Sequence, residues 1–152
     1  MNILNQVKFF NAIPPGVIKD DAAFVSNVID KAELLPQDAK GILFVVQLGA
    51  TDIAAAVLKV MESDTETNAT TLGGTPAEVH DVTTKPGADD DNGLFLIYVP
   101  MSAWTEQYLQ IQATAGDGTA GTYLSALAIV DAPGASGPTA ALLGASSLEI
   151  AS

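Results

Sequence analysis

Short apolar runs separated by Gly, Pro, Asp and Asn recur along this chain and restrict the folds open to it. Gly41–Gly49 and Gly93–Pro100 are almost continuously apolar, as in strands buried on both faces. Glu106–Ala115 alternates polar and apolar residues, which is the period of a half-exposed strand. Thr122–Val130 follows a glycine-rich turn of hairpin composition. Seven or eight such short strands, with turn signals between them, predict an all-β fold, either a sandwich or a barrel.

Other segments give weaker signals. Ile3–Phe10 and Ala77–Val82 are further strand candidates, and Ala22–Ala32 mixes β-branched with polar residues. Ile53–Glu62 carries its large apolar residues at helical spacing and contains three alanines, which favour a helix. From its residues alone this segment is as consistent with a helix as with a strand.

The chain divides into three parts by composition. Residues 1–21 form a proline-interrupted apolar arm, residues 22–131 the β-sandwich domain, and residues 132–152 a tail rich in Gly, Ala, Ser and Pro. Both end segments either pack along their own domain or reach a neighbouring subunit. Their large apolar residues and the arm's first proline are the candidates for an interface: Phe9, Phe10, Ile13, Pro14, Val17, Leu142 and Leu143.

The charge of the chain excludes several kinds of partner. The chain contains 18 Asp and Glu residues, six lysines and no arginine, so its formal net charge is −12. Nucleic acids and anionic membrane surfaces would be repelled. No apolar run approaches the roughly 20 residues of a membrane-spanning helix, and the first residues lack the pattern of a signal peptide. We expect a protein made in the cytoplasm, with neither a nucleic-acid nor a membrane partner.

Candidate chemical groups are few. The chain contains no cysteine and one histidine, so a Ser-His-Asp triad or a histidine metal site would have to use His80. In a regular strand Glu78 would share a face with His80 and could orient it as a base; otherwise His80 is an ordinary polar strand residue. Asp89, Asp90 and Asp91 form a weak calcium candidate, because the residues that follow lack the ligand spacing of an EF-hand. Trp104 is the one large ring for stacking a sugar and is more typical of a plug at one end of a sandwich. We therefore expect neither an enzyme nor a cofactor.

The order of several segments resembles a known group of proteins. Over about residues 20–132 the chain is similar to small virion proteins of tailed bacteriophages. The segments that carry the similarity follow one another in the order GILFVVQLGATD, LKVMESD, NGLFLIYVP and a closing pair, YLQIQATAGDG and YLSALAIV. The resemblance is to capsid decoration, or cement, proteins. It implies an antiparallel, jelly-roll-like β-sandwich of about eight strands and a strand rather than a helix at Ile53–Glu62. It offers no catalytic residues.

The same resemblance implies a location and partners. Decoration proteins bind the outer capsid surface, commonly as homotrimers at three-fold positions, and stabilise the shell against the pressure of the packed genome. The expected partners are therefore the major capsid protein and further copies of this chain. Two alternatives stay open: a virion carbohydrate-binding or adhesion module using Trp104, Tyr98 or Tyr108, and a tail-tube or head–tail connector subunit.

Overall fold

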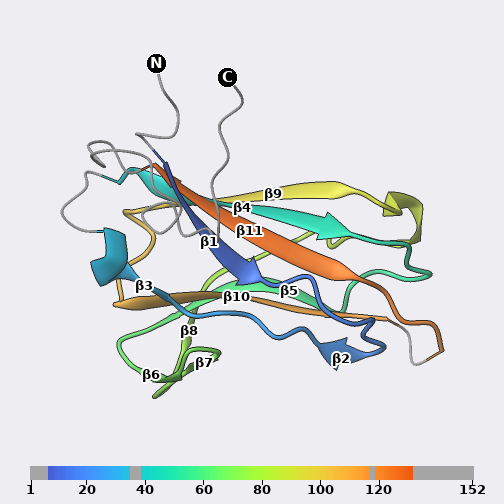
Figure 1. Cartoon of the computed structure of the whole chain (residues 1–152), viewed down its shortest axis with the longest axis horizontal. Helices are drawn as coiled ribbons and strands as arrows, with labels where there is room; N and C mark the ends of the chain where they lie inside the picture. The colour runs from blue at the N-terminus through green and yellow to red at the C-terminus, as the bar shows by residue number, and fades with distance from the viewer. Residues whose placement is uncertain (1–6, 35–38, 117–118, 132–152) are drawn as a thin grey trace, which may run out of the picture.

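A computed structural model describes residues 7–34, 39–116 and 119–131 and shows two facing β-sheets (Figure 1). One sheet has the strand order β1 (Val7–Ile13), β11 (Leu124–Asp131), β4 (Gly41–Leu48), β9 (Leu94–Pro100). The other has the order β2 (Ala22–Ala23), β10 (Tyr108–Ala115), β5 (Val57–Ser63), β8 (Ala77–Asp81), and β3 (Ile29–Asp30) also pairs with β10. The remaining elements are the hairpin β6 (Glu66–Asn68) and β7 (Thr71–Leu72) and two short 3-10 helices, η2 (Lys31–Leu34) and η3 (Ala88–Asp90).

The strand order is that of a jelly roll. If β3 and the β6–β7 hairpin are set aside, eight principal strands remain, and numbering them consecutively gives sheet orders 1-8-3-6 and 2-7-4-5. This is the arrangement of two interleaved Greek keys, and the pairings within both sheets are antiparallel. The predicted all-β, antiparallel sandwich is confirmed.

The core lies between the two sheets and follows from the alternation of side chains along each strand. On β4 and β11 every second residue points inward and is buried, including Ile42, Phe44 and Val130. Leu58, Leu109 and other alternate residues of β5 and β10 close the core from the other sheet. Each such large side chain contributes about 1.5–3 kcal/mol on burial.

The segment with helical spacing is a strand in its second half. Val57–Ser63 pairs with β10 along seven consecutive residue pairs, whereas Ile53–Ala56 lies in the connection that precedes it. The helical reading is therefore wrong and the strand reading confirmed for this half. Pairing with β10 buries Leu58 and Val60 in the core, and this tertiary gain outweighs the local preference for a helix.

The segment predicted to be an arm contributes a strand. Val7–Ile13 pairs with β11 and forms one edge of the four-stranded sheet, so the sandwich includes residues before position 22. The register shifts between Asn11 and Ile13, and this bulge leaves Ala12 and Ile13 both buried. Residues 132–152 lie outside the described part of the chain. Within that part, no helix is long and apolar enough to cross a lipid bilayer.

Candidate binding surfaces

The outer face of the four-stranded sheet is uncharged across three rows of paired residues. Because directly paired residues of antiparallel strands point to the same side, the register fixes this face. Its side chains come from β1, β11, β4 and β9 and are Phe9, Ile129, Leu43 and Tyr98 in one row, Asn11, Leu127, Val45 and Leu96 in the next, and Ser125, Gln47 and Leu94 in the third. We call this set the apolar face.

The edge strand β9 is the most exposed part of the apolar face. Leu94, Leu96 and Tyr98 are 59%, 62% and 58% exposed, respectively. Leu127 in the middle of the sheet is also exposed. A soluble protein rarely leaves a continuous apolar patch of several hundred Å² in water, so such a patch marks a site of contact with another surface.

The outer face of the opposite sheet is polar by contrast. Gln110 and Gln112 of β10 are hydrogen-bonded to each other, and Lys59 of β5 lies 3.9 Å from the carboxylate of Glu78 on β8. Gln110 also donates to the main-chain carbonyls of Ser26 and Thr70. The two outer faces therefore differ in chemistry, and only one of them is apolar.

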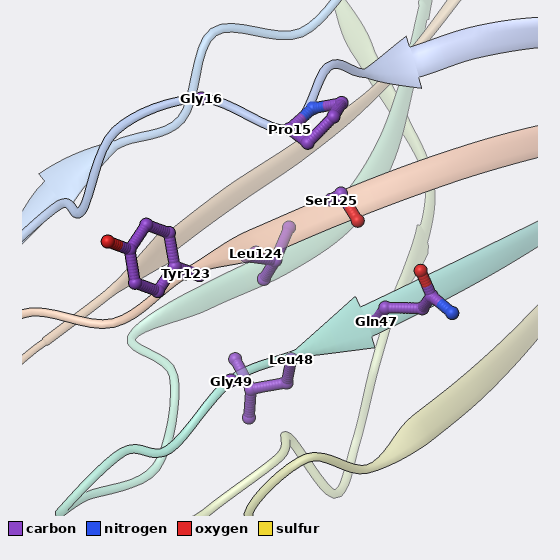
Figure 2. Close-up of a pocket in the computed structure, with 8 residues that line it drawn as sticks. All are labelled: Pro15, Gly16, Gln47, Leu48, Gly49, Tyr123, Leu124 and Ser125. Carbon is purple, nitrogen blue, oxygen red and sulfur yellow. The ribbon is translucent and has the colours of Figure 1, made fainter.

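A shallow pocket of 170 Å³ adjoins the apolar face at the ends of β4 and β11. Figure 2 shows Pro15 and Gly16, from the segment after β1, beside Leu124 and Ser125 of β11 and above Gln47 and Leu48 of β4. The exposed ring of Tyr123 forms part of the rim. Because Gln47 and Ser125 belong to both, the pocket continues the apolar face.

Several connections meet beyond this pocket and form what we call the loop end, comprising residues 14–21, 49–56, 86–93 and 119–123. Main-chain hydrogen bonds join them: Lys19 and Thr122 exchange two, of 3.0 and 2.8 Å, and the Gly49 N–H donates to the Tyr123 carbonyl. Val17 at this end is 71% exposed, and Ile18 is also exposed. Pro14, Val17 and Val25 line a second hollow of 240 Å³.

The structure separates the predicted interface residues. Phe9 belongs to the apolar face, whereas Phe10, its neighbour on β1, points inward and packs against the core, with Lys8 Nζ 4.8 Å from its ring centre. Ile13 is buried in its own core. Pro14 is half-buried and Val17 is exposed at the loop end. Leu142 and Leu143 lie outside the described residues.

His80 and Glu78 do not share a strand face. His80 pairs with Val60 and Glu78 with Met61, and these two partners are neighbours on β5 whose side chains point to opposite sides. A β-bulge in β8 at this point breaks the alternation that the sequence predicted. Glu78 lies near Lys59 instead, so the structure does not bring His80 and Glu78 together as a base and its orienting acid.

Two of the three consecutive aspartates accept hydrogen bonds from the backbone around η3. An Asp90 carboxylate oxygen accepts from the Gly87 N–H at 2.9 Å, and Asp91 Oδ1 accepts from the Thr51 N–H at 2.7 Å. Among the described residues there is no group of three or more His, Cys, Asp or Glu side chains placed to hold a metal ion. Asp90 and Asp91 thus fix the loop that leads into β9.

Trp104 fills the end of the sandwich opposite the loop end. It is buried, and Lys31 Nζ lies 5.2 Å from its ring centre and donates to its carbonyl oxygen. Its indole Nε1 finds no hydrogen-bond partner within the described part of the chain. A ring buried in this way cannot stack on a sugar, which removes Trp104 from the carbohydrate-binding alternative.

The buried carboxylate of Glu62 holds the connection after Trp104. Its Oε2 accepts from the N–H groups of Thr105 and Glu106 at 2.7 and 3.0 Å, and its Oε1 accepts from the Thr105 hydroxyl at 2.9 Å. Glu62 was not among the residues expected to be important. Its position becomes informative once β5 is known to be a strand, because it is then the one acid on the inward face of that strand.

On β10, the pKa of Tyr108 is raised above its ordinary value of 10.0. Partial burial of the phenol is the main cause, and the carboxylates of Asp30 and Glu66 raise the pKa further. Both effects disfavour the tyrosinate.

Sequence analysis also left out Leu94 and Leu96. Their run was read as a strand buried on both faces, and within this chain that reading is wrong, because one face of β9 points to solvent. The composition nevertheless fits a strand that is covered on both sides, one side by the core and the other by another molecule.

No protein family model and no curated protein sequence matches the chain. Among solved structures, it is similar to a chain of "Structure of infectious bursal disease virus Gx strain", with a TM-score of 0.35 and 19% sequence identity. The match covers 86% of this chain and 33% of the viral chain, so this chain spans about a third of the length of its neighbour. At this TM-score the likeness carries no inference about the present protein.

Proposed function

We propose that this chain is a structural virion protein that decorates the outer surface of a tailed-phage capsid. The observation that carries the proposal is the apolar face, because exposed apolar side chains gathered on one face mark a surface that binds another protein. A role in binding protein surfaces accounts for that face directly.

The resemblance to decoration proteins supports the same role. The segments that carry it form β4, β5, β9, β10 and β11, five of the six long strands of the jelly roll. Three of these five, together with β1, build the apolar face. Decoration proteins bridge neighbouring capsomers, so the outward push of the packed genome must break additional contacts. An oligomer that presents several shell-binding ends at once would strengthen this grip through effective concentration.

The loop end is the surface that we assign to the shell. Val17 and Ile18 project from it beside the hollow lined by Pro14 and Val25. Exposed apolar anchors next to a hollow are the features from which binding hot spots are built. The major capsid protein is the proposed partner, and the location is the capsid exterior.

Cosedimentation tests this function. Purified protein is mixed with expanded capsid shells of the phage that encodes it, from which the decoration layer has been removed. The wild type should pellet with the shells, and Val17→Lys should weaken binding at least about fivefold, since loss of a central anchor costs about 1 kcal/mol or more. Deleting the arm is unsuitable, because residues 7–13 form a strand of the sheet.

Ala103→Lys is the matched control. Ala103 is exposed in the turn after β9, at the end of the sandwich opposite the loop end, and its substitution changes the charge equally. It should leave shell binding unchanged. A wild-type protein that stays in the supernatant overturns the proposed function, whereas equal loss in both variants overturns the assignment of the loop end.

A further inference from the structure

We infer that the apolar face is the surface through which copies of this chain associate with one another. The inference deepens the proposed function by naming the partner of this face, a second copy of the chain. It leaves the loop end free to meet the shell. The charge, the shape and the area of the face each point to this partner.

Charge selects the partner. The three rows of the apolar face hold no ionisable side chain that is charged at neutral pH. A charged surface placed against it would lose hydration without gaining an opposite charge, which is costly. The outer face of the five-stranded sheet carries Lys59, Glu78 and Asp81, so it is too charged to cover the apolar face. The apolar face of another copy is uncharged and fits.

Shape points to the same partner. Two β-sheets pack face to face at about 10 Å when their twists agree, with strand directions within about 30° of one another. A copy of the chain supplies a sheet of the same twist. Its side chains also vary in size, from Ser125 and Val45 to Phe9 and Tyr98, so that large residues of one copy can enter the spaces over small residues of the other.

Area sets the extent of the contact. Four strands about 4.8 Å apart, each contributing about 24 Å of length, give a face of roughly 450 Å² before side-chain relief is counted. A standard interface buries about 800 Å² on each partner. The neighbouring pocket and the exposed ring of Tyr123 extend the apolar surface toward that value, so the contact includes the ends of β4 and β11.

The net charge adds a distinctive salt dependence. Two copies at −12 repel each other at long range, although no like charges meet on the apolar face itself. Raising the salt concentration from about 0.05 to 0.5 M shortens the screening length from more than 10 Å to less than 5 Å and should tighten self-association. Binding to a basic partner would weaken instead.

The test is the solution mass of the intact chain by light scattering over a dilution series, without shells. We expect a multiple of 15.6 kDa that falls toward 15.6 kDa on dilution and persists to lower concentrations at high salt. Leu96→Lys should raise the dissociation constant at least about tenfold, because it buries a charge in the contact. Leu94→Ser, which adds no charge, should act in the same direction and covers the case in which Leu96→Lys fails to fold.

Ala103→Lys is the matched control, since Ala103 is exposed in the turn after β9 and lies outside both the apolar face and the loop end. It should associate like the wild type. A wild type of 15.6 kDa at every concentration overturns the inference, as does association that Leu96→Lys and Leu94→Ser leave intact or that Ala103→Lys weakens equally. Oligomers that fail to bind shells refute the proposed function alone, and monomers that bind shells refute this inference alone.

Discussion

The phenol ring of Tyr98 on β9 lies against the backbone of Gly41 on β4, so closely that a Cβ at position 41 would overlap the ring. The Tyr98 hydroxyl donates to the Lys40 carbonyl at 3.2 Å. Both residues lie on the outer side of the four-stranded sheet. The missing side chain of Gly41 therefore provides the space that an aromatic residue of the apolar face occupies.

Gly41→Ala should displace the Tyr98 ring and weaken self-association while the fold persists. The nearest atoms belong to the far end of a side chain that can swing away, so we expect a loss of about 1 kcal/mol in unfolding free energy, similar to one hydrogen bond. Urea denaturation and light scattering measure the two effects. Tyr98→Phe keeps the ring and should associate normally; weaker association of that variant would show that the hydroxyl, rather than the ring, matters.

Glu62→Ala should destabilise the sandwich by about 2–4 kcal/mol. The change removes a buried acceptor of three hydrogen bonds and leaves the N–H groups of Thr105 and Glu106 without it. Thermal and urea denaturation give the loss. The exposed Glu66 provides the control, since Glu66→Ala should stay within about 0.5 kcal/mol of the wild type. Equal stability of both variants would contradict a supporting role for Glu62.

Gly116→Ala should be more damaging than Gly16→Ala. Gly116 has a φ of +99°, and a Cβ there would lie 2.6 Å from the main-chain nitrogen of Asp21. Strain at a positive φ costs about 1–3 kcal/mol, to which the backbone clash adds. Around Gly16 the nearest atom to an added Cβ is the Pro14 carbonyl oxygen at 3.8 Å, so its substitution should be nearly neutral. If the two variants have the same melting curve, the close packing of Gly116 against Asp20 and Asp21 does not limit stability, and this explanation is contradicted.

Alkaline pH should weaken the fold through Tyr108. Its folded pKa is raised above the 10.0 of the unfolded chain, so the folded state retains the proton more tightly. The resulting stability is fully present below pH 10.0 and is lost as the pH rises through the folded pKa.

Tyrosinate absorbance during an alkaline titration, with Tyr108→Phe as the difference standard, measures this pKa directly. Glu66→Gln should lower it, because one neighbouring negative charge is removed, but should leave it raised, since burial is the larger cause. A Tyr108 that titrates at or below 10.0 in the wild type would contradict the account.

The long strands could be predicted from sequence because core burial and strand period act together in them. Gly41–Gly49 and Gly93–Pro100 each contain the strand that the structure shows there, and Thr122–Val130 contains all of β11 except its last residue. The edge strand Val7–Ile13 overlaps the weaker strand candidate Ile3–Phe10 but was placed in an arm, since its polar Asn11 and its bulge obscure the alternation. The bulge in β8 likewise separated Glu78 from His80, and single-residue shifts of this kind leave no mark in the sequence.

The candidate surface was only partly foreseeable. Phe9 and Val17 were expected at an interface from their apolar character in a proline-interrupted segment, whereas Phe10 and Ile13 turn inward because of their strand parity and the bulge. Leu94 and Leu96 could not be identified from the sequence. A fully apolar run predicts a strand with both faces covered, but it does not distinguish cover by the same chain from cover by another molecule. Register, which is a tertiary property, identified them.

The burial of the apolar face against protein can be measured through a single thiol, because the chain contains no cysteine. Leu96→Cys and Val25→Cys place that thiol at sites that are nearly equally exposed in the isolated chain. The rate at which a water-soluble maleimide reacts with each thiol measures the fraction of time that the thiol is accessible to solvent. At concentrations where oligomers form, the Leu96→Cys thiol should react about tenfold more slowly than the Val25→Cys thiol, and dilution should bring the two rates together. Equal rates at every concentration would contradict the account.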